Sequence, residues 1–369
     1  MCLRLFFTLN VVVLSLLKLP AQEVIRIPAG DPLSQASLAD RWTWAQKEAR
    51  QRKLQQGFWV GFSVGRLMEE GSFFNTHFSE SRQSPKTLEE ILYGTDRQSH
   101  RRTRDHFDPS ERYRRVQKDI AILFRFQPHA DVSRKPEKVS AGTIGLSFDA
   151  LEYPIVWLGG VSHEESVTLL VTHYDNSSSI DFKSTILGIL SWHERSTKAY
   201  ELLTKVLNGP DAEDLRKKAA LFLGEFDDNV TLELLQQAAE SDRSSAVAEN
   251  AVLGISRMES ESAVDVLVKL AKNSKRDGVR KKAVHSLSRF ASEKAVSTLQ
   301  DIVYNDKDVE LQKQALYALS RIKKDDPIPQ LISLARSHTN SEVRKYAIYL
   351  LGQSKDERAL DALIDLVKK

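Results

Sequence analysis

Two His-Glu pairs are the residues of this sequence that could most readily do chemistry, because histidine and glutamate are both common metal ligands. The pairs are His163-Glu164 and His193-Glu194. The zinc-protease pattern His-Glu-x-x-His needs a second histidine one helical turn later, but Val167 and Thr197 occupy those positions. We therefore expect no metal site. A metal-dependent enzyme that uses both pairs is kept as the alternative function.

Ser63 is the only other candidate for catalysis, because Gly61 and Gly65 give it the Gly-x-Ser-x-Gly spacing of a hydrolase nucleophile. That nucleophile requires a strand that turns sharply into a helix. Here the serine lies inside an aromatic and β-branched run, Gly57 to Gly65, which is typical of a strand. We interpret Ser63 as structural. The sequence contains no phosphate-binding loop or dinucleotide-binding glycine pattern, so we expect no catalytic residue and no cofactor.

The densest basic stretch lies between residues 100 and 115. It contains Arg101, Arg102, Arg104, Arg112, Arg114 and Arg115, with His100 and His106. A phosphate or nucleic-acid contact is one interpretation of this stretch, and a solvated charge run is the other. The second is favoured because acidic residues are interspersed and the whole chain has 53 Lys and Arg against 50 Asp and Glu. We expect no nucleic-acid partner.

Residues 1–22 have the organisation of a secretory signal. Arg4 gives the basic start, Leu5 to Leu17 the apolar centre and Leu19-Pro20-Ala21 the small-residue exit. The apolar run is shorter than the ~20 residues of a membrane helix. We expect a periplasmic or secreted protein, and a retained membrane anchor is the alternative because the exit lacks Ala-x-Ala. The only cysteine, Cys2, lies in this segment, so the mature chain would have no disulfide or thiolate site.

A repeat with a period of 32 residues runs from Leu215 to Lys369, and each unit has two apolar segments of helical periodicity. The first helix repeats an aliphatic residue at Leu215, Val247, Val279, Leu311 and Val343, an alanine at Ala219, Ala251, Ala283, Ala315 and Ala347, and a small residue at Gly224, Ser256, Ser288, Ser320 and Gly352. The second helix repeats Leu235, Leu267, Leu299, Leu331 and Leu363. Alanine is expected where two helices cross closely, because a larger side chain would push the axes apart.

The sequence before Leu215 is less regular. Residues 23–150 are expected to form a small α+β head with a mainly antiparallel sheet, one or two helices and a long polar loop at about 69–116. Residues 151–181 are expected to be a degenerate capping repeat at the junction. The predicted fold is therefore mostly α, an α-α superhelix joined to a smaller α+β region. The predicted units are 182–214, 215–246, 247–278, 279–310, 311–342 and 343–369.

The units VRKKAVHSLSRF (Val279 to Phe290) and VRKYAIYLLGQ (Val343 to Gln353) resemble HEAT repeats, most closely the short bacterial type also found in phycobilisome-lyase-like proteins. The head resembles that of exported bacterial HEAT-repeat proteins through GFWVGFSVGRL and PIVWLGG. The resemblance implies a right-handed solenoid that binds another protein and has no fixed site. HEAT-like di-iron hydroxylases use four His-Glu pairs on successive repeats, whereas this chain has two, at a spacing out of register with the array.

In HEAT solenoids the second helices usually line the concave face that binds the partner, and this implies where a partner would bind here. The candidate residues are Glu233, Gln237, Lys269, Lys272, Asp301, Tyr304, Arg336 and Asp365. Charge and size change from unit to unit, so we expect one shaped surface and no one-residue-per-repeat code. Tyr304 and Arg336 are the expected anchors, because Tyr and Arg are frequent hot-spot residues. The predicted function is an exported, non-enzymatic scaffold for another protein.

Overall fold

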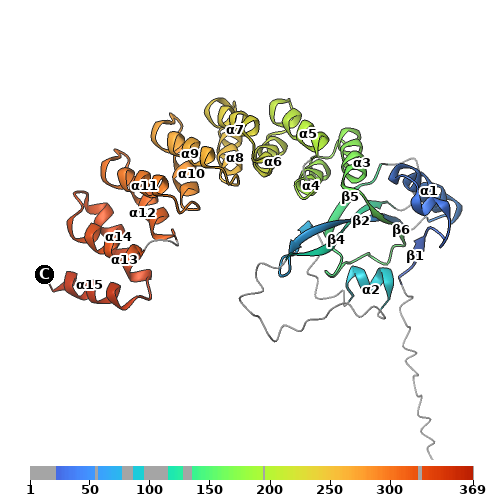
Figure 1. Ribbon diagram of the computed structural model, residues 1–369, viewed down its shortest axis with the longest axis horizontal. Helices are drawn as coiled ribbons and strands as arrows, with labels where there is room; N and C mark the ends of the chain where they lie inside the picture. Colours follow the sequence, from blue (N-terminus) through green and yellow to red (C-terminus); the bar gives the residue numbers. More distant parts are fainter. Residues whose placement is uncertain are drawn as a thin grey trace, which may run out of the picture.

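The computed structural model describes residues 22–54, 57–76, 86–94, 115–127, 135–193, 196–322 and 326–368. These residues form a head, built on a six-stranded sheet, and an arc of paired helices that leads away from it (Figure 1). The signal segment and the arginines between residues 101 and 114 lie outside the described residues. No helix in the described ranges is both long and apolar enough to span a bilayer.

The sheet of the head is mixed, with the strand order β1-β6-β2-β4-β5-β3. The strands are β1 (Val24–Arg26), β2 (Phe58–Glu69), β3 (Asn75–Thr76), β4 (Arg115–Phe126), β5 (Lys138–Thr143) and β6 (Ile155–Val161). β2, β4, β5 and β3 are antiparallel neighbours, as predicted, but β6 runs parallel to both β1 and β2. β6 comes from the segment 151–181, which was expected to be a capping repeat, so the first half of that segment belongs to the sheet and only its second half, with α3 (His163–Asn176), lies in the arc.

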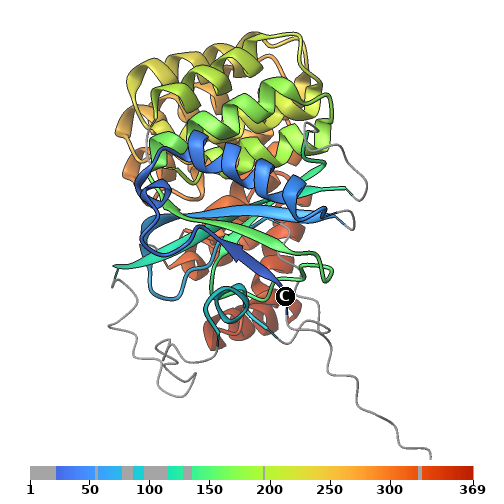
Figure 2. The same cartoon turned by 90° about the vertical axis from the view of Figure 1, so that its right-hand side faces the viewer.

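The two faces of the sheet carry separate helices, as Figure 2 shows. The helices of the head are α1 (Leu38–Gln51) and α2 (Leu88–Tyr93), after the short 3-10 helix η1 (Pro32–Gln35). α2 is the short helix that interrupts the expected polar loop, and it packs Leu88 and Leu92 against Trp59 and Trp157. The opposite face of the sheet packs against α1 and the first helices of the arc.

The arc consists of α3 followed by six pairs of helices within the described residues. Their bounds are α3 (His163–Asn176), α4 (Ile180–Leu190), α5 (Thr197–Asn208), α6 (Glu213–Leu223), α7 (Asn229–Ser241), α8 (Ser245–Ile255), α9 (Glu261–Asn273), α10 (Asp277–Leu287), α11 (Glu293–Asn305), α12 (Val309–Ser320), α13 (Pro327–Ser337), α14 (Ser341–Gln353) and α15 (Glu357–Val367). The repeated aliphatic and alanine positions of the first helices are buried, with Ala283 fully enclosed. The mostly α architecture and its repeat array are therefore confirmed.

Two layers of helices form the arc. The first helices of the units, α4, α6, α8, α10 and α12, lie on the inner side, and the second helices α5, α7, α9 and α11 lie on the outer side (Figure 1). Successive inner helices also pack on one another more closely than successive outer helices do. In a curved array the more closely packed layer is the inner one, and here that layer is formed by the first helices. The expectation that the second helices line the concave face is therefore wrong for this chain.

Two arginines at equivalent positions form an ion pair within their own unit and a hydrogen bond to the unit before it. Arg216 on α6 pairs with Asp242 at the end of α7, and its Nε atom donates to the carbonyl of Leu207, 2.9 Å away, at the end of α5. Arg280 on α10 repeats this arrangement with Asp306 and the carbonyl of Ala271. Each arginine thus neutralises a carboxylate at the end of its unit's second helix and also satisfies a carbonyl at the end of the preceding helix, and the Arg216–Asp242 pair is the more deeply buried of the two.

Candidate functional site

The histidines of the two His-Glu pairs do meet, although they are 30 residues apart in the sequence. His163 is the first residue of α3 and His193 follows the end of α4, and their ring centroids are 5.5 Å apart in an edge-to-face arrangement. The ring atoms are engaged in structural hydrogen bonds. Nε2 of His163 lies 3.0 Å from the carbonyl oxygen of Gly65. Nδ1 and Nε2 of His193 lie 3.0 Å from the Ile189 carbonyl and 2.8 Å from Oγ of Ser166.

The glutamates do not complete a metal site in the described structure. Glu164 is directed to solvent and forms an ion pair with Lys198 at 3.0 Å, and Glu194 lies outside the described residues. Within the described ranges, no group of three or more His, Cys, Asp or Glu side chains could hold a metal ion. Burial lowers the pKa of His193 to about 4, so its ring is neutral at pH 7. The geometry therefore gives no support to the metal-dependent alternative.

The cavity beside these histidines is small and belongs to the packed junction between the head and the arc. Its volume is about 10 Å³, and its lining includes Arg66, Phe74, Trp192 and His193. A space of this size holds about one water molecule. The guanidinium of Arg66 lies over the Trp192 ring, 5.3 Å from its centroid, and Trp192 also contacts Phe74. We interpret this cluster as structural.

Ser63 lies in the middle of β2, where its neighbours are Ala121 on β4 and Gly160 on β6. It is almost fully buried, and β2 continues to Glu69 without turning into a helix. The strand–turn–helix arrangement of a hydrolase nucleophile is therefore not formed around this serine.

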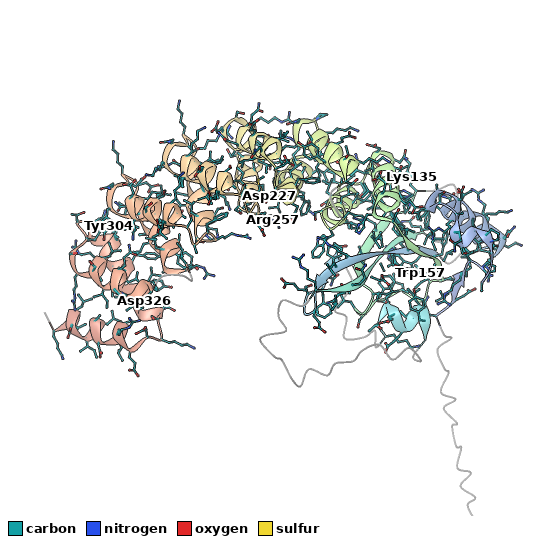
Figure 3. All side chains as sticks on the ribbon, in the orientation of Figure 1. Lys135, Trp157, Asp227, Arg257, Tyr304 and Asp326 are labelled. Carbon is teal, nitrogen blue, oxygen red and sulfur yellow. The ribbon has the colours of Figure 1, made fainter. Side chains whose placement is uncertain are left out.

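The structure places the eight expected partner-binding residues on the second helices, and Figure 3 shows Tyr304 on the outer side of the arc. Five of them form ion pairs between neighbouring units. These are Lys269 with Glu240 at 3.0 Å, Lys272 with Asp301 at 2.7 Å, and Arg336 with Asp365 at 3.6 Å. Glu233 and Gln237 are exposed. Tyr304 is 50% exposed, and its ring rests against His338 with 5.7 Å between centroids. The charges of the outer face largely neutralise each other.

The inner side of the arc carries repeated basic and aromatic residues that the sequence analysis did not single out. We call this surface the inner ridge, and it consists of Lys281, Lys282, His285, Arg289, Lys313, Tyr317, Arg321, Lys345, Tyr346 and Tyr349. Its members lie on α10, α12 and α14 or directly after them, opposite the buried positions of each helix. Arg257 precedes Arg289 by one period and is seen on the inner side of the arc in Figure 3.

Aromatic rings and cations pack on each other along the inner ridge. Arg321 lies over the Tyr317 ring, 5.6 Å from its centroid, and its Nη1 donates to the Tyr317 hydroxyl at 3.3 Å. Lys313 lies 5.8 Å from the centroid of Tyr346, which stacks on Tyr349 with 5.8 Å between centroids. These contacts hold long side chains in place on an exposed surface.

Comparison with known families agrees with the geometry of the array. The family model of HEAT repeats matches residues 232–320 and 302–369, which include most of α7 and all the helices after it. The array carries HEAT repeats. The inner ridge therefore lies on the first helices of the last three HEAT units. A shift of 32 residues aligns Lys, Arg and aromatic positions of the ridge, so the sequence alone could have shown that basic and aromatic residues recur on the first helices.

Three solved structures match parts of the chain at low identity. The complex of CpcE and CpcF of phycocyanin lyase from Nostoc sp. PCC7120 has 15% identity and a TM-score of 0.34, over 42% of this chain and 98% of that one. Human deoxyhypusine hydroxylase in complex with glycerol has 22% identity and a TM-score of 0.25, over 56% and 79%. A computationally designed cyclic homo-oligomer has 16% identity and a TM-score of 0.14, over 56% and 90%. None of the curated proteins matches the chain.

Proposed function

We propose that the protein is an exported scaffold that binds another protein through the surface of its HEAT array and catalyses no reaction. The observation that carries this proposal is the continuous arc of paired helices with HEAT units (Figure 1), whose exposed residues differ between the ion-paired outer helices and the inner ridge. Such arrays present a broad surface without a deep pocket, and partners are held by many side chains on that surface.

Capture of a partner tests the scaffold proposal. The full-length mature protein is immobilised and exposed to extract of the native cell envelope, and bound proteins are identified by mass spectrometry. We expect one protein to be retained saturably and in stoichiometric amount, and then to form a complex of defined mass with the purified chain. The proposal is contradicted if the immobilised chain retains no protein above the level of an empty matrix, although circular dichroism shows that the chain is folded.

Export is proposed from the sequence of residues 1–22. We expect the mature protein to begin at or near Glu23 and to occur in the soluble periplasmic or secreted fraction, because the apolar segment resembles a cleaved signal. N-terminal sequencing of the protein purified from its native cell checks this. A chain that keeps its first residues and remains with the membranes would instead show the anchored form of the same scaffold.

A further inference from the structure

We propose that the inner ridge is the partner-binding surface of the array and that it binds an acidic, extended polypeptide segment. This inference rests on the proposed scaffold function and adds the place of binding and the chemistry of the bound segment.

The first support is the balance of charge on the ridge. Its six Lys and Arg side chains lie on or directly after the first helices of three consecutive units, α10, α12 and α14. Lys313 and Lys345 are paired, with Glu310 and Glu342 on their own helices. By contrast, Lys281, Lys282 and Arg289 form no ion pair or side-chain hydrogen bond with any described residue. On the outer face, Lys269 and Lys272 are paired with carboxylates of neighbouring units. The inner ridge instead retains an excess of positive charge that a negatively charged ligand could neutralise.

The second support is the exposure of aromatic rings among these cations. Tyr317 is 37% exposed and Tyr349 is 56% exposed, and they occupy the same repeat position on α12 and α14. Tyrosine and arginine are enriched at the centres of protein interfaces, because both bury a large area and still form hydrogen bonds. Tyr317 and Tyr349 could therefore pack against side chains that lie between the acidic residues of a bound segment.

The repeat spacing defines the pattern of the segment. Packed helix axes are ~8–10 Å apart, and an extended chain advances about 3.3 Å per residue. One unit of the ridge therefore matches about three residues of extended peptide. The expected ligand has Asp or Glu at every third position over about nine residues, with apolar or aromatic residues between them.

A polypeptide is favoured over a nucleic acid because the basic patch of the ridge is small and the chain as a whole is close to neutral. The whole chain has 53 basic and 50 acidic residues, whereas nucleic-acid binding is usually supported by a wide basic surface. An acidic segment of a few charges matches a basic patch of this size.

The test measures binding of a fluorescein-labelled nonapeptide with Glu at positions 1, 4 and 7 and with Leu or Tyr between, using fluorescence anisotropy at low salt. We expect saturable binding to the full chain that weakens as salt is raised. The double variant Arg289→Glu and Arg321→Glu should lose at least ~10-fold in affinity. The control Lys269→Glu and Lys272→Glu makes the same change in net charge on the outer face, and should change affinity less than ~2-fold.

Three results would overturn the inference: no binding of the peptide, equal losses in the inner and outer variants, or tighter binding of a single-stranded DNA of equal charge. Circular dichroism of both variants verifies that they are folded, and Tyr349→Ala provides a second ridge variant without charge reversal that should also weaken binding. If the wild-type chain captures a partner but the ridge variants capture it equally well, the scaffold proposal stands and this inference fails. If the wild-type chain captures no partner, the scaffold proposal itself fails.

Discussion

Gly224→Ala is expected to destabilise the protein by about 3 kcal/mol, the upper end of the usual cost of overpacking. A Cβ atom at Gly224 would lie 2.1 Å from the carbonyl oxygen of Gly254, so two backbones would have to separate. Because Gly224 follows α6 and Gly254 lies on α8, the added methyl group would open the inner layer of the arc. Urea unfolding followed by circular dichroism measures the difference in free energy.

Gly352→Ala is the matched control, since Gly352 occupies the same repeat position on α14. Nothing lies within 4 Å of a Cβ atom built there. Alanine is favoured over glycine in a helix by about 1 kcal/mol, so this variant should be as stable as the wild type or more stable. Equal destabilisation by the two substitutions would show that the close approach of α6 and α8 is not what requires Gly224.

His173→Phe is expected to remove much of the pH dependence of stability below neutral pH. The His173 ring on α3 lies 5.0 Å from Trp42 and 4.8 Å from Phe124, between ring centroids, and its Nε2 atom is buried without a hydrogen-bond partner. Burial lowers the pKa of His173 from 6.5 to about 4. The folded state therefore favours the neutral ring, whereas the unfolded chain takes up a proton as the pH falls through 6.5.

The sign of the effect follows from this difference. The stabilising contribution of neutral His173 is fully present above pH 6.5 and is lost as the pH falls from 6.5 to about 4. The pKa difference corresponds to roughly 3 kcal/mol, as an order of magnitude. Phenylalanine fills a similar volume and does not titrate. Between pH 7 and pH 4, the free energy of unfolding of His173→Phe should therefore fall by about 3 kcal/mol less than that of the wild type. Part of the pH dependence should remain, because the pKa of His193 is lowered to a similar value.

Unfolding free energies measured by urea titration at several pH values test the His173 prediction. His285→Phe is the control, because it removes an imidazole from an exposed position on α10. That variant should keep the slope of the wild type. If His173→Phe also keeps it, titration of His173 is not a source of the acid sensitivity.

The repeat columns made the array predictable from the sequence, but the side of the arc that faces inward was predicted wrongly. The 32-residue period identifies which residues of each helix are buried. It does not show whether the first or the second helices of the units pack more closely on one another. That depends on side-chain size at the crossings between units. Gly224 and Gly254 let α6 and α8 approach closely, with no side chain between the two backbones. A larger residue at such a crossing would keep the helix axes further apart, and this close approach cannot be read from the 32-residue period alone.

The head was less predictable because its central pairings are not local. The sequence predicted the strand around Ser63, whereas α2 lies within the stretch expected as a long polar loop. It did not predict that β6 runs parallel to β2, because that pairing joins segments almost 100 residues apart. The meeting of His163 and His193 has the same origin, since it depends on α3 and α4 packing against the sheet.

The junction between the sheet and the arc has a mechanical consequence. Only Ser162 separates β6 from α3, and one apolar core extends from Ile25 in the first strand to Ala359 in the last helix. Within the described residues, this shared core has no gap between the sheet and the first helices of the arc. A force that a bound partner exerts on the inner ridge would therefore be distributed as small displacements over the helix crossings of the arc. Because the packed interior is hard to compress, these displacements would reach the sheet.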